Sequence, residues 1–356
     1  MGKASGKAEF RTIAAQLEMG IRRNIYSDRL PNIQSLMAHF DVSKQTMTRA
    51  LALLQKSGVL QFKGRSGMMI DRTKLKVKKI ALVAAWTDGR KNDLLSVIGP
   101  FLKDLDTMGF LVELIRGDNQ QHNFFPEHVL KGFDGVILRS RVRHESALKK
   151  LSAAKIPCVS ADSNPWVPEI DSTEYDALSA INQIASDLKN RGFRRIALLY
   201  SSSAPGGNDQ IFTAWRKIKK SLELPRLSCD RVHFTDGWEW EKNAILLFKH
   251  IQKMKERPEI LIHYGGKFDQ RIKSYLQNTP EYPFGMKVLY QESLWEHCSI
   301  APEDILIRSY DRSVLITEAF SILLERFLDP QAPPIHRKIP FPVEYLQFPS
   351  CPDKTS

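Results

Sequence analysis

The stretch that most constrains this 356-residue chain runs from residue 30 to residue 71. Apolar residues recur there at helical spacing in two groups, Ile33, Leu36, Met37 and Phe40 and then Met47, Ala50, Leu51 and Leu54. Asp41, Val42 and Ser43 interrupt the pattern between the two groups. The spacing therefore predicts a helix, a short turn and a second helix.

The second of these helices has a defined start and a polar outer face. Ser43 stands at the N-cap position, where its hydroxyl can accept hydrogen bonds from free backbone N–H groups. The outward positions that follow are Lys44, Gln45, Thr48 and Arg49, beside Thr46. Side chains of these types reach phosphates and base edges from a helix in the major groove of DNA. The pattern is typical of a recognition helix.

A basic hairpin is predicted directly after this helix. Gly58 ends the helix, and residues 59–62 and 68–70 read as two short strands. The tip between them, Lys63-Gly64-Arg65-Ser66-Gly67, has glycines that permit the turn and two cations that suit a wing on a phosphate backbone. The alternative is a small helical subdomain whose Lys and Arg side chains are simply solvated.

The positive charge of the chain is concentrated at its start. Residues 1–79 contain 16 Lys and Arg against 5 Asp and Glu, which gives +11 of the total of +12. Such a concentration is the electrostatic footprint of a module that binds a polyanion. An anionic membrane surface is the rival partner, but it would favour a basic amphipathic helix with a bulky apolar face. Double-stranded DNA is therefore the expected partner.

The remaining composition is that of a soluble globular protein. Hydrophobic residues make up 42% and charged residues 26%, and the length allows two or three domains. No apolar run approaches the roughly 20 residues of a membrane span, and the N-terminus has no apolar signal core. Four widely spaced cysteines are expected to be buried thiols in a reducing compartment: Cys158, Cys229, Cys298 and Cys351. We expect a cytoplasmic protein without membrane association.

Residues 8–71 resemble the winged helix-turn-helix of GntR-type bacterial transcription regulators. The resemblance rests on Leu30-Pro31, on Ser43-Lys44-Gln45-Thr46 and on the spacing of residues 50–58 before the wing. It implies DNA contacts by residues of the second helix and the wing, namely Lys44, Gln45, Thr46, Arg49, Lys63, Arg65 and Gly67.

The chain departs from this family pattern at three positions. Asn32 and Gln34 stand where a charged residue is usual, and Thr48 stands where an arginine is usual. The bases that the second helix would read therefore stay open.

Two further segments flank this motif. Residues 9–26 have apolar spacing that predicts a first helix, which would complete a three-helix core. Residues 72–79 form a charged connector, which we expect to be an exposed linker rather than a segment that becomes ordered on DNA.

Beyond residue 79 the pattern changes to alternating apolar strands and helices. In the first half, a helix over residues 94–108 accompanies strands predicted at residues 80–85, 110–115, 134–138 and 157–161. In the second half, strands near residues 195–200, 232–234, 259–262 and 286–290 alternate with helices over residues 174–191, 209–222, 238–254 and 268–276. Such alternation is typical of parallel sheets covered on both faces. Two of them predict two lobes with a cleft between them.

Residues 80–348 resemble the effector-binding domain of the LacI and periplasmic sugar-binding superfamily, in which two α/β lobes close on a small ligand. The supporting stretches are residues 156–162, 189–198 and 288–293. A GntR-type winged helix joined to such a sensor is the arrangement of arabinose-repressor-like regulators. The expected fold is an N-terminal winged helix-turn-helix (α+β) followed by a two-lobed α/β periplasmic-binding-protein-like domain with parallel sheets.

This resemblance also implies domain boundaries. The expected parts are a DNA-binding domain over residues 1–71, a basic linker over 72–79, an effector-binding domain over 80–348 and a tail over 349–356.

By position, the same resemblance implies ligand contacts by Thr87, Arg139, Asp162, Trp238 and Glu292. Three of them have a structural alternative. Trp238 could be a core anchor, Asp162 could cap a turn, and Arg139 could belong to a solvated cationic loop or bind an anion.

Two stretches depart from the ligand pattern of the superfamily. Residues 208–211 contain no arginine where one is usual, and residues 264–266 read Tyr-Gly-Gly where Asn-Asp is usual. A changed ligand and a sensor that has lost its ligand both stay open.

No catalytic or metal-binding pattern stands out. The histidines lack zinc-ligand spacing, a Gly-x-Ser-x-Gly elbow is absent, and the glycine loop at 204–209 lacks the Lys-Ser/Thr ending of a phosphate-binding loop. We therefore expect no enzyme, no metal and no cofactor.

The expected function is a sequence-specific DNA-binding transcription regulator, a repressor, that acts as a homodimer. It would be controlled by a small ligand, a sugar or related polyol, bound between the two α/β lobes. The alternative is a small-molecule-binding or processing protein whose basic N-terminal module docks on a partner other than DNA.

Overall fold

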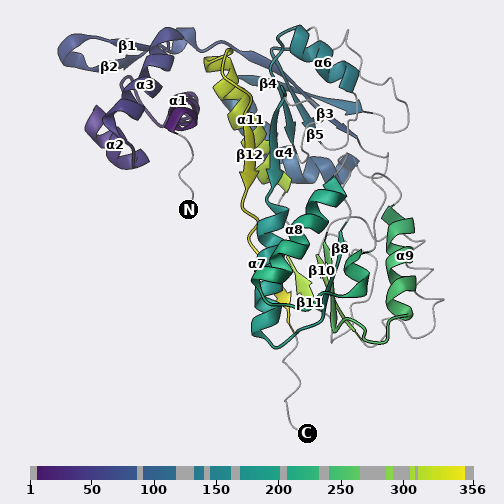
Figure 1. Ribbon diagram of the computed structural model, residues 1–356. Coiled ribbons are helices and arrows are strands. Elements are labelled where there is room, and N and C mark those ends of the chain that lie inside the picture. The colour runs from purple at the N-terminus through teal and green to yellow at the C-terminus, as the bar shows by residue number, and fades with distance from the viewer. Residues whose placement is uncertain are drawn as a thin grey trace. The chain divides into compact units, whose positions relative to one another are not determined.

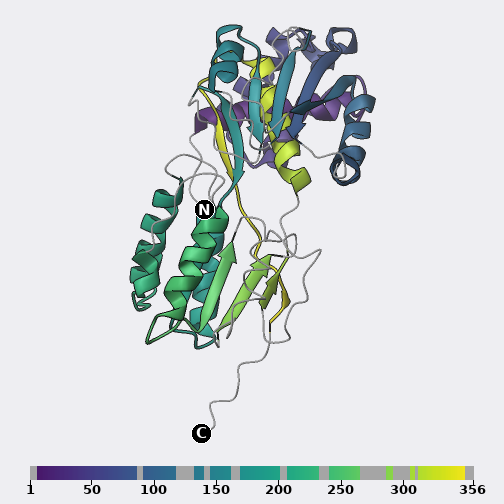
Figure 2. The ribbon, with the colours of Figure 1, turned by 90° about the vertical axis from the view of Figure 1, so that its right-hand side faces the viewer.

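The computed structural model describes residues 6–85, 91–117, 132–139, 145–161, 169–200, 207–231, 240–264, 286–291, 305–308 and 312–348. Their contacts group the chain into two compact units, Met1–Glu174 with Arg312–Lys338 and Tyr175–Asp311 with Ile339–Ser356. Figures 1 and 2 show the elements within each unit. The first unit contains an N-terminal module, residues 6–71, and a first lobe; the second unit is a second lobe.

The N-terminal module is a three-helix core with a hairpin. Its elements are α1 (Gly6–Arg22), α2 (Ile33–Phe40), α3 (Lys44–Lys56), β1 (Leu60–Phe62), the 3-10 turn η1 (Gly64–Ser66) and β2 (Met68–Ile70). The buried side chains of Leu17, Ile21, Met47 and Leu54 form its core. Strands β1 and β2 pair antiparallel. The predicted helix, turn, helix and hairpin are thus confirmed.

The first lobe is built around a six-stranded sheet in the part of the chain that the structure describes. Its order is β12-β7-β6-β5-β3-β4, and the pairs from β7 to β4 are parallel. The strands are β3 (Lys78–Ala85), β4 (Phe110–Gly117), β5 (Gly135–Arg139), β6 (Cys158–Ala161), β7 (Asp171–Tyr175) and β12 (His336–Ile339). Tyr175 and Ile339 already belong to the second unit.

Helices cover both faces of this sheet. Helices α4 (Lys91–Thr107) and α11 (Arg312–Leu328) pack on the face that carries Ile80 and Leu82. Helix α6 (Glu145–Ala153) packs on the opposite face, against Ala81 and Val83. The apolar run at residues 80–84 therefore contributes side chains to two cores, as expected for a parallel strand covered on both sides.

The second lobe repeats this plan with a five-stranded sheet among its described residues. The order is β13-β11-β10-β9-β8, parallel except for β13. Its strands are β8 (Ile196–Tyr200), β9 (Ile260–Tyr264), β10 (Lys287–Gln291), β11 (Ile305–Ile307) and β13 (Tyr345–Gln347). Helices α7 (Ala177–Asn190) and α8 (Gly207–Ser221) share a core on one face, and α9 (Trp240–Gln252) packs on the other. Figure 1 shows the sheet between them.

The predicted α/β alternation is confirmed, with several boundaries shifted and several elements added. The helix expected over 174–191 begins at Ala177, because residues 171–175 form strand β7 beside β6. The sequence pattern also did not predict β11, α11, β12 and β13. The strand expected near 232–234 and the helix expected over 268–276 lie outside the described residues.

Residues 72–77 join the N-terminal module to β3. Residues Arg72–Lys74 form the 3-10 turn η2, and β3 begins at Lys78. The side chains of Lys74, Lys76 and Val77 are exposed. At the start of η2, the carboxylate of its N-cap Asp71 accepts hydrogen bonds from the backbone N–H and the hydroxyl of Thr73. The connector is thus short and partly structured.

Candidate nucleic-acid interface and effector site

The recognition helix α3 begins as the sequence predicts. The hydroxyl of Ser43 accepts a hydrogen bond from the backbone N–H of Thr46 at 3.2 Å, so Ser43 is the N-cap. Its oxygen also lies 3.0 Å from the Thr46 hydroxyl. The Thr46 side chain therefore supports the cap, and it is half-buried.

One face of α3 is buried and the other carries the predicted contact residues. Met47, Ala50, Leu51 and Leu54 are buried in the core of the module. The opposite face exposes four polar side chains that can reach a groove, Lys44, Gln45, Thr48 and Arg49. This arrangement leaves the polar side chains of the first turns of α3 exposed to solvent.

Arg49 has a partner that the sequence did not reveal. Its guanidinium lies 4.0 Å from the centroid of the Phe10 ring on α1. Such a cation–π contact restrains the side chain without using its N–H donors. Phe10 itself is buried. A local sequence pattern could not identify this pair, because it depends on how α1 packs against α3.

The wing brings a lysine and two glycines together at the tip of the hairpin. The backbone N–H of Lys63 donates to the carbonyl of Gly67 at 2.9 Å and closes the turn. Gly67 has φ +77, a left-handed conformation that favours glycine. The side chain of Lys63 is exposed. Arg65 lies in η1, and its side chain is outside the described part.

A second cap was missed in the sequence. The Asn32 side chain accepts a hydrogen bond from the backbone N–H of Ser35 at 2.9 Å and caps α2. Asn32 was considered only as a departure from a charged family position. An Asn immediately before an apolar helical run is the signal that could have identified it.

Only one of the five predicted ligand residues can be placed in the structure. Arg139 is the last residue of β5, half-buried, and pairs in register with Ala84 of β3 and Ala161 of β6. It therefore lies at the carboxyl end of the first parallel sheet, where α/β proteins bind ligands. Thr87, Asp162, Trp238 and Glu292 lie outside the described residues.

The sequence positions of these residues still relate to described strands. Thr87 follows the end of β3 by two residues, Asp162 follows β6 directly, and Glu292 follows β10 directly. Of the departures at 208–211 and 264–266, the described side chains include only that of Ile211, which is buried. Thr87, Asp162 and Glu292 thus each follow the carboxyl end of a parallel strand in the sequence.

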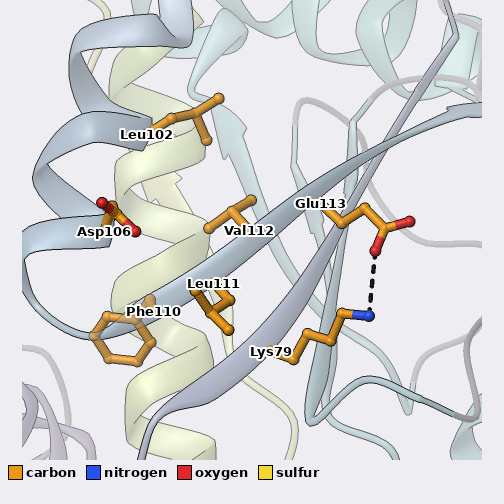
Figure 3. Close-up of a pocket in the computed structure, with 7 residues that line it drawn as sticks. All are labelled: Lys79, Leu102, Asp106, Phe110, Leu111, Val112 and Glu113. Carbon is orange, nitrogen blue, oxygen red and sulfur yellow. Dashed lines mark ion pairs between the residues drawn. The ribbon is translucent and has the colours of Figure 1, made fainter.

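A separate groove lies at the edge of the first sheet (Figure 3). It has a volume of about 330 Å³ and runs between α4 and strand β4, lined by Lys79, Leu102, Asp106, Phe110, Leu111, Val112 and Glu113. Lys79 and Glu113 form an exposed ion pair at 3.3 Å. Arg139, the one predicted ligand residue among the described ones, does not line this groove.

Among the described residues, no group of three or more His, Cys, Asp or Glu side chains is placed to hold a metal ion. None of the helices in that part of the chain is both long and apolar enough to span a membrane.

The sequence of the chain matches two protein families in succession. Residues 10–70 match the family described as bacterial regulatory proteins, gntR family. Residues 82–264 match the family described as periplasmic binding proteins and sugar binding domain of LacI family. A relative from Bacillus subtilis (strain 168), the uncharacterized HTH-type transcriptional regulator YydK, is 38% identical over 71 residues, which is 19% of this chain. The matched region spans only 30% of that relative.

Solved structures share the fold at low identity. A regulatory protein of the LacI family from Chloroflexus aggregans superposes with a TM-score of 0.55 at 14% identity, over 74% of this chain and 96% of that one. The LacI family transcriptional regulator CCPA from Weissella paramesenteroides, solved with bound sucrose, gives 0.54 at 14% identity, over 78% and 100% of the two chains. The two-lobed α/β fold is thereby established.

Proposed function

Because the chain belongs to the family of periplasmic binding proteins and LacI-type sugar-binding domains, behind a segment of GntR type, we propose that it is a DNA-binding transcription regulator. The observation that carries this proposal is the capped helix α3 with an exposed polar face beside a basic wing. The concentration of +11 net charge in residues 1–79 supports a polyanionic partner. We assign residues 1–71 to DNA binding, 72–79 to the linker, of which Lys78 and Lys79 already belong to β3, 80–348 to effector binding and 349–356 to a tail.

The proposed DNA contacts divide into two kinds. The exposed side chains at the start of α3 would read base edges, and those of the wing would contact phosphates. Gln45 and Arg49 are the proposed base-reading residues, and Lys44 and Thr46 would lie beside the DNA backbone. The wing would contribute Lys63, Arg65 and Gly67. The stacking of Arg49 on Phe10 supports a fixed direction for its guanidinium.

We propose that the regulator is a homodimer that binds a two-fold symmetric operator as a repressor in the cytoplasm. Two recognition helices would then enter successive major grooves. The two-fold symmetry expected of such an operator supports a dimer, because each half-site would take one copy of the recognition helix.

The proposed effector is a small sugar or related polyol. The sucrose in the Weissella structure belongs to that protein, and it supports the same ligand class here through the shared fold alone. We propose Thr87, Arg139, Asp162, Trp238 and Glu292 as contacts. The position of Arg139 at the carboxyl end of β5 supports this assignment.

Duplex binding measured by fluorescence anisotropy over a range of salt tests the DNA proposal. Affinity for any duplex should fall steeply with ionic strength, because several phosphates are neutralised. Lys63→Ala should weaken binding to all sequences alike and reduce the slope of log affinity against log salt by about one. Lys220→Ala, on an exposed position of α8, is the matched control and should change neither quantity.

Sequence preference distinguishes the recognition helix from the wing. Gln45→Ala should change the preference between operator variants by about 1 to 3 kcal/mol at one position. If the purified protein bound no duplex in a salt-sensitive manner, the regulator proposal would be abandoned. The basic N-terminal module would then bind a partner other than DNA.

A further inference from the structure

Helix α1 is shared between the N-terminal module and the first lobe. It contacts α3 on one side and α11 on the other. Both sets of contacts belong to one continuous apolar core, which includes Leu17 and Met47 of the module together with Phe110 and Phe320 of the lobe. Figure 1 shows α1 beside these helices within the first unit. A domain joined to its neighbour only by a flexible linker does not usually have one of its helices packed against the neighbour's core, as α1 is packed against α11.

The C-terminal end of α1 is attached by a buried arginine. The guanidinium of Arg22 donates to the carbonyl of Met108 at 3.1 Å and to the carbonyl of Lys76 in the connector at 3.2 Å. It also bonds Glu18 and lies 4.4 Å from the centroid of the Phe110 ring. Arg22 is 9% exposed, so separation of the module would remove several partners from a buried charge.

The N-terminal half of α1 is attached to α11 and to strand β12. Arg11 forms a 2.7 Å ion pair with Asp329 just after α11. Arg337 on β12 pairs with Glu325 at 2.7 Å and lies 3.4 Å from the hydroxyl of Thr12. Glu325 is fully buried, and burial raises the pKa of its carboxyl against the opposing effect of Arg337. The polar contacts at this end are therefore buried at Glu325 and half-buried at Arg11, Asp329 and Arg337.

These attachments lie next to two functional elements of the chain. Phe10, beside Arg11 and Thr12, stacks under Arg49 of the recognition helix. Arg337 lies two residues before Ile339, where the chain passes from the first unit to the second for the last time. A short path of direct contacts thus runs from the recognition helix through α1 to the strand that leaves the first lobe.

We propose that the N-terminal module is docked on the first lobe through α1 and is carried with that lobe as one body. The docking itself is argued from the contacts of α1, and only its role in regulation rests on the proposed function. A movement of the first lobe would then move the recognition helix with it. Residues 72–77 would follow this movement and would not serve as a flexible tether.

Limited digestion of the full-length chain with trypsin tests the docking without DNA. The connector contains Arg72, Lys74 and Lys76 as natural cleavage sites. In the docked state, cleavage requires opening, so the wild-type connector should be cut at least about 100-fold more slowly than a synthetic peptide of residues 70–81. Fragments that end within the connector are quantified by mass spectrometry.

Variants at the two ends of α1 identify the contacts responsible. Arg22→Ala should accelerate connector cleavage by roughly tenfold or more, because the bonds to Met108 and Lys76 are lost. Arg11→Ala should accelerate it at the other end and serves as the second variant if circular dichroism shows that Arg22→Ala does not fold. Arg308→Ala removes an exposed ion pair with Glu344 in the second unit and should leave the cleavage rate unchanged.

Two results would overturn the docking. One is wild-type cleavage at the rate of the free peptide, and the other is a wild-type rate of cleavage in every α1 variant that folds. Duplex binding of the same proteins is measured in parallel. A protein that binds no duplex but resists trypsin would refute the proposed function and leave the docking intact.

Discussion

Ser43 is the residue on which the recognition helix begins. Its hydroxyl accepts the Thr46 N–H, so Ser43→Ala should lower the free energy of unfolding of the first unit by about 1 kcal/mol. Urea unfolding followed by circular dichroism measures this loss. Ser43→Asn keeps a capping oxygen and should recover most of it. An unchanged midpoint in Ser43→Ala would show that the cap contributes little to this helix.

His263 makes the second lobe sensitive to acid. The side chain is 1% exposed on β9, and burial lowers its pKa from 6.5 to about 4. Between these values the unfolded chain binds a proton that the folded chain excludes, so stability falls as the pH falls from 6.5 towards 4. At pH 5 the loss should be about 2 kcal/mol relative to neutral pH.

The variant His263→Met isolates this contribution from that of the carboxyl groups. The difference in unfolding free energy between wild type and variant should change with pH only between about 4 and 6.5. Urea unfolding at pH 5 and pH 7.5 measures it. A difference that is the same at both values would show that His263 does not titrate on unfolding in this range.

Helix α11 approaches the first sheet closely at Gly135 of β5. A Cβ added there would lie 2.9 Å from the Leu323 Cδ1 and 2.9 Å from the Phe327 Cζ. Gly135→Ala should therefore destabilise the first unit by about 1 to 3 kcal/mol through overpacking. Shortening the neighbour should relieve the clash, so the double variant with Leu323→Val should lose less stability than the sum of the single variants. Purely additive losses would show that α11 shifts to accommodate the methyl group.

Helices and strands whose signal is local were predictable from the sequence, and those whose partners are distant were not. Helices α2 and α3 repeat apolar residues at one spacing, and Ser43 lies beside the N–H groups it caps. Strand β12 and helix α11 instead belong to a lobe whose other strands end at residue 175. A single sequence does not show which earlier sheet a late strand joins.

The candidate site divides in the same way. The exposed face of α3 follows from its helical period, so Lys44, Gln45 and Arg49 could be selected directly. The ring that supports Arg49 lies on another helix, at Phe10. Glu18 is spaced four residues from Arg22, yet the carbonyls that Arg22 also contacts come from later segments. Tertiary packing decides such contacts, and local patterns do not encode them.

In the molecule as a whole, charge and sheet architecture are separated along the chain. Residues 1–79 carry nearly all of the net charge, whereas the sheets of the two lobes, apart from the first two residues of β3, are built from later residues that are almost neutral in sum. The proposed DNA contacts and the proposed effector contacts therefore lie in different parts of the sequence. Coupling between them requires an effector that binds the DNA-competent and DNA-incompetent states with different affinity.

A thermal-shift screen of pentoses, hexoses, uronic acids and sugar phosphates tests the effector proposal on the intact chain. A ligand that binds only the folded protein, at 100 times its Kd, should stabilise it by about 2.7 kcal/mol and raise the melting temperature. Arg139→Ala should abolish the shift, whereas Arg308→Ala, an exposed arginine of the second unit, should retain it. A shift retained in Arg139→Ala would remove Arg139 from the site. No shift with any sugar or anion would favour a sensor that has lost its ligand, because a compound that binds the folded state must raise the melting temperature.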